Sequence, residues 1–207
     1  MVYSHLRFAA KPHDIHAVRI SAGGADLLLG CDMVSSADPE TLAKLRAGNS
    51  KAVVNEHQTM TADFTRQPDM MFPEEGLKQT LREEAGQDSV DFFEATAMAR
   101  KLLGDTIAAN MMVVGYAYQK GLLPVSADAI ERAIELNGVA IEFNKQAFLW
   151  GRRAAHDMAA VETIIGRNDE KPQPFELDGF IERRINDLTA YQNKTYSDKY
   201  SALIDRI

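Results

Sequence analysis

The sequence contains little of what marks secreted, membrane-spanning or cluster-binding proteins. Cys31 is the only cysteine among 207 residues, which excludes an intramolecular disulfide and any zinc or iron–sulfur site held by several thiolates of this chain. No apolar run reaches the roughly 18 residues of a membrane helix. The best candidate, Ile107–Tyr118, is shorter and contains Asn110. The first residues lack the order of a signal peptide, so we expect a cytoplasmic protein that does not enter a membrane.

Positive charge is also scarce. The chain carries 23 lysines and arginines against 30 aspartates and glutamates, a formal net charge of −7, whereas nucleic-acid phosphates require clustered basic residues. The glycine-rich nucleotide-binding motifs, the serine nucleophile motif G-x-S-x-G and the zinc motif H-E-x-x-H do not occur. These absences argue against nucleic acid as a partner and leave the reaction class open.

What the sequence does contain is an alternation of strands and helices. Residues 25–31 (ADLLLGC) and 51–55 (KAVVN) are short apolar segments of the kind that form buried parallel strands. Between them, Asp38 and Pro39 are typical of a helix start, and we expect that helix to run to about Ala47. A strand, a helix and a strand in so few residues predict a parallel sheet. Further expected elements are strands at 2–8, 16–20 and 90–94, helices at 74–85, 97–103 and 106–120, and a loop at 61–73.

The most consistent helix signals lie between Leu122 and Arg152. Ser126 can cap a helix, and Asn137-Gly138 is typical of a helix end because both residues tolerate left-handed backbone. A second apolar stripe follows, so the segment predicts two helices joined at a tight corner. Its aromatic side chains are more typical of a core or an interface than of a cofactor pocket: Phe143, Phe148 and Trp150.

The pattern predicts a three-layer α/β domain with a partly parallel sheet and a helical C-terminal extension. We expect the α/β domain at 1–165, with the Leu122–Arg152 helices on one side. Residues 166–174, which are charged and contain two prolines, predict a linker. The extension occupies 175–207, with amphipathic helices at 177–193 and 195–207.

The residues at the end of the buried strand 51–55 are candidates for ligand binding, and we select Asn55 and Thr59 among them. Asn55 ends this strand, Glu56, His57, Gln58 and Thr59 follow it, and open parallel sheets bind ligands outside the carboxyl ends of their strands. Asp32 falls under the same rule. Cys31 is interpreted as a small buried hydrophobe rather than a nucleophile, since no basic group adjoins it.

A second candidate group lies on the first expected strand. Ser4, His5 and Arg7 form a polar cluster that can recognise an anion or carboxylate, with Arg7 as a bidentate partner. The alternative is an edge strand with a surface salt bridge. His13 and His16 are three residues apart, but they are interpreted as solvated loop histidines rather than metal ligands. We predict no catalytic residue and no metal site in this chain.

Several strings of the sequence resemble a known family. These are NGVA, NKQAF and GR within 123–152, with ADLLLGCD and VYSHLR before them. Together they resemble the γ domain of 2-oxoacid:ferredoxin oxidoreductases, most closely the indolepyruvate branch. The late string LTAYQNKTYSDKYSALIDRI resembles the long fused bacterial form. In this family the γ domain opens with a glycine-rich strand–helix unit, whereas this chain begins at the S-H-x-R strand, so an unpaired sheet edge is expected.

The resemblance implies oxidative decarboxylation of an arylpyruvate to an acyl-CoA, with electrons passing to ferredoxin or a similar acceptor. Thiamine diphosphate with Mg²⁺ and iron–sulfur clusters would do this chemistry in other domains or subunits. This chain would dock against them and shape the approach of CoA or substrate, and would be inactive when isolated; a homo-oligomer is compatible with this role. The alternative is a purely structural interaction module that contacts no ligand.

Overall fold

The computed structural model describes residues 3–59, 71–166, 177–204 and 206. Contacts within the chain divide it into two compact units, Met1–Arg167 and Asn168–Ile207, which are described separately. Most of the predicted linker at 166–174 and of the predicted loop at 61–73 lies outside the described residues. Among the described helices, none is both long and apolar enough to cross a membrane.

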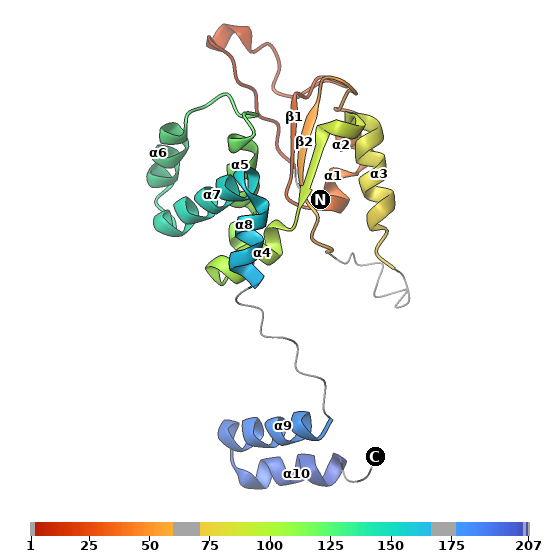
Figure 1. Ribbon diagram of the computed structural model, residues 1–207, viewed down its shortest axis with the longest axis vertical. Coiled ribbons are helices and arrows are strands. Elements are labelled where there is room, and N and C mark those ends of the chain that lie inside the picture. Colours follow the sequence, from red (N-terminus) through yellow and green to blue (C-terminus); the bar gives the residue numbers. More distant parts are fainter. Residues whose placement is uncertain (1–2, 60–70, 167–176, 205, 207) are drawn as a thin grey trace. The chain divides into compact units, whose positions relative to one another are not determined.

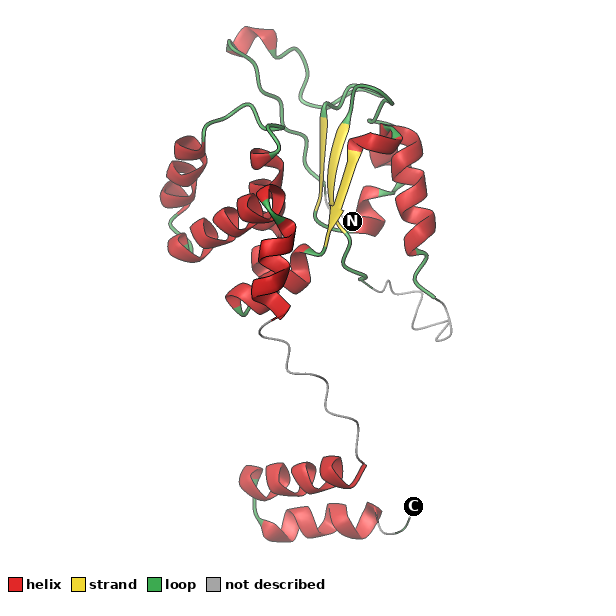
Figure 2. Cartoon of the chain, in the orientation of Figure 1, coloured by secondary structure: helices red, strands yellow, loops and turns green. Residues whose placement is uncertain are grey.

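The first unit is built on a parallel sheet of three described strands, in the order β1-β2-β3 (Figure 2). They are β1 (Leu27–Gly30), β2 (Lys51–Asn55) and β3 (Val90–Phe93), and each pair is parallel. All three strands were predicted from the sequence. The order makes β1 and β3 the edge strands of the described sheet.

Helices cover both faces of this sheet, which confirms the three-layer α/β prediction (Figure 1). On one side α5 packs against β1 and β2, with α4, α7 and α8 around it, and on the other α1 and α3 pack against the strands. The bounds are α1 (Met33–Ser36), α2 (Pro39–Leu42), α3 (Glu74–Ala85), α4 (Ala95–Leu103), α5 (Ala109–Gln119), α6 (Ala127–Asn137), α7 (Ile141–His156) and α8 (Met158–Gly166), with short 3₁₀ turns at η1 (Pro12–Asp14), η3 (Gln87–Ser89) and η4 (Thr106–Ala108).

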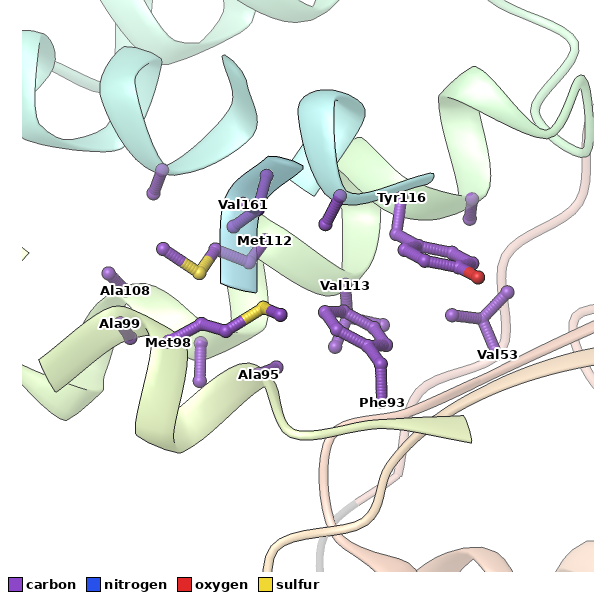
Figure 3. Packing of buried hydrophobic residues seen from close by; sticks show 14 residues of the cluster. Val53, Phe93, Ala95, Met98, Ala99, Ala108, Met112, Val113, Tyr116 and Val161 are labelled. Carbon is purple, nitrogen blue, oxygen red and sulfur yellow. The ribbon is translucent and has the colours of Figure 1, made fainter. Parts of the chain in front are cut away.

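Successive residues of β2 belong to different cores, which explains its continuous apolar sequence. Val53 lies in the cluster shown in Figure 3, where the rings of Phe93 and Tyr116 stack with centroids 4.5 Å apart. Val54 lies in the second cluster, with Met33 of α1 and the buried side of α3. Both faces of the strand are therefore buried away from water.

The predicted helix pair at 122–152 is present as α6 and α7. Ser126 caps α6 by accepting a hydrogen bond from the backbone N–H of Ala129 at 3.2 Å, and Gly138 ends it with φ of +72°. The pair does not cover the sheet directly, because α7 packs on α5, which lies between it and the strands. Its aromatic residues belong to that packing: Phe148 is buried, while Phe143 and Trp150 pack against the same cluster.

Two predicted strands are absent. Within the described residues, 3–8 and 16–20 are irregular, so the strand predictions at 2–8 and 16–20 are wrong. Hydrogen bonds from side chains, rather than backbone pairing between strands, hold these segments together. His5 Nδ1 accepts from the backbone N–H of Ile20 at 2.9 Å, and Arg7 donates to the carbonyl of Arg19 at 2.7 Å. Alternation of residue character forms a strand only where a neighbouring backbone supplies the hydrogen bonds.

The helix predicted to run to Ala47 ends at Leu42. The carbonyls of Ala43 and Lys44 accept hydrogen bonds from the backbone N–H groups of Gly23 and Ala25, in the turn before β1. These tertiary bonds take carbonyl groups that a longer helix would have used within itself. These hydrogen bonds hold the end of α2 next to the start of β1.

The second unit is a pair of helices, α9 (Leu177–Tyr191) and α10 (Lys194–Ile204), which lie against each other. They correspond to the two helices predicted at 177–193 and 195–207. Near their connection, the hydroxyl groups of Thr189 and Ser197 are 2.8 Å apart and hydrogen-bonded. The helices therefore form an antiparallel hairpin.

Candidate functional site

The carboxyl ends of the three parallel strands lie at one edge of the sheet, and Asn55 ties them together there. The Asn55 side chain is buried, and its Nδ2 donates to the carbonyl of Cys31 at 3.1 Å and to Oγ1 of Thr96 at 2.8 Å. Its Oδ1 accepts two longer bonds of 3.4 Å from the backbone N–H groups of His57 and Thr96. The amide therefore forms hydrogen bonds to other parts of the protein and connects the ends of all three strands.

A hollow of about 440 Å³ opens beside this edge. It lies between the segment that leaves β2, the start of α3 and the end of β3. Its lining is polar and half of it is acidic: Glu56, His57, Gln58, Glu74, Lys78 and Glu94.

Lys78 supplies a positive charge to this hollow and pairs with two of its carboxylates. Its Nζ lies 2.7 Å from Oε2 of Glu56 and also contacts Glu74, which in turn accepts a 2.6 Å hydrogen bond from Gln58. Burial disfavours the protonated form of Lys78, but the bonds to both glutamates outweigh it and raise the pKa of the ammonium group. The hydrogen bonds from Lys78 and then from Gln58 lower the pKa of Glu74.

The other wall pairs a histidine with a helix cap. His57 Nδ1 lies 3.3 Å from Oε1 of Glu94, and Oε2 of Glu94 accepts from the backbone N–H of Ala97 at 3.3 Å, in the first turn of α4. With three carboxylates against Lys78, the hollow favours a cationic group and repels a phosphate. In the described residues no group of three histidine, cysteine, aspartate or glutamate side chains could hold a metal ion.

We expect Lys78→Met to lower the free energy of unfolding by about 2 kcal/mol at neutral pH, because it leaves two glutamates without their partner while keeping the apolar stem. The pKa of Glu74 is lowered in the folded state, so its contribution is lost as pH falls through that pKa. The pKa of Lys78 is raised, so its contribution is lost as pH rises through that pKa. Urea unfolding measured across pH should therefore show the largest difference in stability between the wild type and Lys78→Met at pH values between the pKa of Glu74 and the pKa of Lys78.

Lys145→Met is the matched control, since in the part of the chain that the structure describes Lys145 forms one ion pair, with the surface glutamate Glu135 at 2.8 Å. Its effect should be smaller than that of Lys78→Met at every pH. Equal effects for the two variants would show that the hollow does not strengthen the Lys78 pairs.

A second hollow, of about 250 Å³, lies beside the N-terminal segment. A hydrogen bond to Glu40 raises the pKa of Tyr3 at its rim, and burial adds to that effect. Arg19 and Lys44 outnumber the single carboxylate, so this hollow favours an anion. It is lined by Tyr3, His5, Val18, Arg19, Glu40 and Lys44.

The predicted site residues are divided between these regions. His5 lines the second hollow, Arg7 binds the backbone of Arg19 beside it, and Ser4 is exposed on the same segment. Asn55 and Thr59 line neither hollow, Asn55 because it is buried and Thr59 because it lies exposed past the strand end. Their roles as ligand contacts stay a prediction.

Other residues near the edge have structural roles or differ from expectation. Asp32 caps α1 by accepting from the backbone N–H of Ser35 at 2.7 Å. Cys31 is exposed rather than buried as predicted, because it follows the last residue of an edge strand. Partial burial of the thiol and the neighbouring Asp32 carboxylate raise the Cys31 pKa, which disfavours the nucleophilic thiolate.

Sequence reasoning placed Glu56, His57 and Gln58 at the end of β2 but missed the other charged residues that line the two hollows. Glu94 follows a strand as Asn55 does, and the same rule could have found it. Arg19, Lys44 and Lys78 carry no comparable signal, because only the tertiary fold brings them to the hollows.

The comparison with protein families gives a match over most of the chain. The family model described as pyruvate ferredoxin/flavodoxin oxidoreductase matches residues 1–154, which include all three strands and nearly all of α7. Neither a curated protein nor a solved structure matches the chain.

Proposed function

This chain belongs to the pyruvate ferredoxin/flavodoxin oxidoreductase family, and from that premise we propose that it is the γ portion of an enzyme acting on indolepyruvate or a related arylpyruvate. Members of the family are parts of multi-domain or multi-subunit oxidoreductases. The complete enzyme would decarboxylate the 2-oxoacid oxidatively, form the acyl-CoA and pass two electrons to a ferredoxin-type acceptor. The resemblance of 123–152 to the indolepyruvate branch supports this choice of substrate.

The residues of this chain do not fit the iron–sulfur clusters that such a reaction needs. An iron–sulfur cluster is generally held by four cysteines, whereas this sequence contains Cys31 alone. The described residues also lack a cluster of side chains that could hold a metal ion. We therefore assign the clusters to other parts of the enzyme. From the family resemblance we assign thiamine diphosphate and Mg²⁺ to those parts as well, and no chemical step to this chain.

What this chain would supply is a surface that guides an anionic reactant. CoA phosphates and 2-oxoacid carboxylates are both anions. The hollow at Arg19 and Lys44 has the charge to attract them, whereas the glutamates around Lys78 would repel them. The basic hollow beside His5 is the observation that carries the proposal.

In the complete oxidoreductase, Lys44→Met is expected to raise the KM for CoA about fivefold, the factor that corresponds to roughly 1 kcal/mol of lost ion pairing. The kcat at saturating CoA and the assembly of the enzyme should stay unchanged, because no reacting group is touched. Steady-state kinetics with varied CoA and varied arylpyruvate would measure both constants.

Lys51→Met is the control, since Lys51 is an exposed lysine that binds Ser89 and lines neither hollow. If the two variants have the same KM for CoA and for the 2-oxoacid, the guiding role is wrong.

The second candidate is a purely structural module that holds neighbouring domains together. It is favoured because the side chains of His5 and Arg7 form hydrogen bonds with the backbone of residues 19–20. Under this reading Arg7→Met would loosen the N-terminal segment and reduce assembly of the enzyme, while the assembled fraction would keep its normal KM values.

A further inference from the structure

The α9–α10 hairpin has almost no core of its own. In α9 no residue is buried, and in the described part of α10 only Ser197 is, a small polar residue bonded to Thr189. The apolar residues along the seam are half-buried: Ile181, Ile185, Leu188, Tyr200 and Ile204. Units of about 40 residues or fewer usually need association or a covalent staple to be stable. This hairpin therefore needs a further surface against it.

One broad face of the hairpin carries exposed apolar side chains. At about 100° per residue, Leu177 and Tyr191 fall on the same flank of α9, and Tyr196 and Leu203 fall on the corresponding flank of α10. Leu177 is 61% exposed, Tyr191 80% and Leu203 55%. The rings of Tyr191 and Tyr196 are 6.3 Å apart, so the two flanks meet on one side.

The opposite broad face is charged. Asp178 and Glu182 lie on that flank of α9, and Lys194 and Asp198 form a 3.1 Å ion pair on that flank of α10. Such a face is suited to water. The contrast marks the apolar face as the one suited to contact with another protein surface.

Two opposite charges lie in the middle of the apolar face. Arg184 extends over the ring of Phe180, with its guanidinium carbon 5.2 Å from the ring centroid. Asp187 follows three residues later on the same flank. Within the described residues, neither Arg184 nor Asp187 takes part in an ion pair.

We propose that this face binds the same face of a second copy of the chain, with the two α9 helices antiparallel. A two-fold axis that crosses between Ile185 and Asn186 places Arg184 of each copy opposite Asp187 of the other. The same rotation brings Tyr191 of one helix opposite Phe180 of its counterpart, about one turn from Leu177. The product is a four-helix bundle, in which the exposed apolar residues form the core.

The second helix satisfies the same symmetry. Tyr196 and Leu203 are equally distant from the point between Lys199 and Tyr200, so each meets the other across the axis. The Thr189–Ser197 hydrogen bond fixes how far α10 is shifted along α9. With that shift, the point between Ile185 and Asn186 in α9 lies nearly beside the point between Lys199 and Tyr200 in α10. One rotation therefore pairs both helices.

The charge pattern favours a second copy over a partner with a plain apolar groove. A groove of that kind would bury Arg184 and Asp187 without partners, at a cost of several kcal/mol for each ion. In the symmetric pair each charge meets its opposite, and the interface contains two such pairs.

The test is the self-association of the full 207-residue chain, measured by sedimentation equilibrium over a range of concentrations. The wild type is expected to dimerise. Arg184→Asp and Asp187→Arg should each weaken dimerisation at least about tenfold, because each places like charges opposite one another. The double variant that carries both changes should dimerise nearly as tightly as the wild type, because the pairs are restored with their signs exchanged.

Glu182→Arg is the matched control, because Glu182 lies on the opposite face of α9, and it should leave dimerisation unchanged. Far-UV circular dichroism would establish that every variant keeps its helices. A monomeric wild type, a dimer that the single reversals do not weaken, or a double variant that does not recover would each overturn the proposal.

Discussion

Gly115→Ala and Gly151→Ala are each expected to lower the free energy of unfolding by about 3 kcal/mol, at the upper end of the cost of overpacking a core. The two glycines face each other's helices where α5 and α7 cross. A Cβ on Gly115 would overlap the carbonyl oxygen of Phe148, and a Cβ on Gly151 would overlap the carbonyl oxygen of Met112. Backbone atoms cannot rotate away as side chains do, so the helices would have to separate.

Separation would also open the core around them. Met112 and Val113 of α5 and Ala147 of α7 are fully buried at this contact, and they would lose packing along the crossing. The double variant should cost less than the two single costs added together, because the first substitution already moves the helices apart. Urea unfolding of the three variants would measure this.

Gly76→Ala supplies the control, because Gly76 lies in α3 and a Cβ there meets nothing within 4 Å. That change should stabilise the protein by about 0.5–1 kcal/mol, the usual gain from replacing glycine in a helix. If Gly115→Ala and Gly151→Ala were as stable as the wild type, the close crossing of α5 and α7 would be wrong.

Asn55→Leu is expected to destabilise the first unit by about 3 kcal/mol. Leucine has a similar volume but takes away every hydrogen bond of the amide, so the carbonyl of Cys31, the hydroxyl of Thr96 and two backbone N–H groups lose their partner. Amide hydrogen exchange should show that the ends of β2 and β3 open more readily than the rest of the sheet.

Asn49→Leu is the matched control. Within the described residues the Asn49 side chain makes one hydrogen bond, an exposed bond of 3.3 Å to Asp26, and its loss should have little effect on stability. In the complete enzyme, the Asn55→Leu protein that folds should keep its KM for CoA. A stable variant with a raised KM would instead return Asn55 to the ligand-binding role that the sequence predicts for it.

The sequence was most informative where local signals and burial agree. The apolar runs at 25–31 and 51–55 predicted two neighbouring parallel strands because both faces of the sheet are covered. Ser126 and Gly138 predicted the ends of α6 because capping depends on residues close in the chain. In contrast, the pattern at 2–8 carried no information on whether a partner strand lay beside it, and the segment is irregular.

The site was harder to predict for a related reason. The rule on strand ends located Asn55 at the correct edge, but a buried amide and a ligand-binding amide have the same sequence signature. The hollow there depends on Lys78 of α3, which approaches the strand end only in the folded chain. The basic hollow depends in the same way on Lys44, positioned where α2 is tied to the turn before β1.

The central claim is that this chain supports a reaction whose cofactors lie elsewhere, and its most direct test is an assay of the isolated 207-residue chain. With arylpyruvate, thiamine diphosphate, Mg²⁺, CoA and a ferredoxin-type acceptor supplied, we predict no reduction of the acceptor, whereas the complete oxidoreductase reduces it under the same conditions. Turnover by the isolated chain would contradict the account.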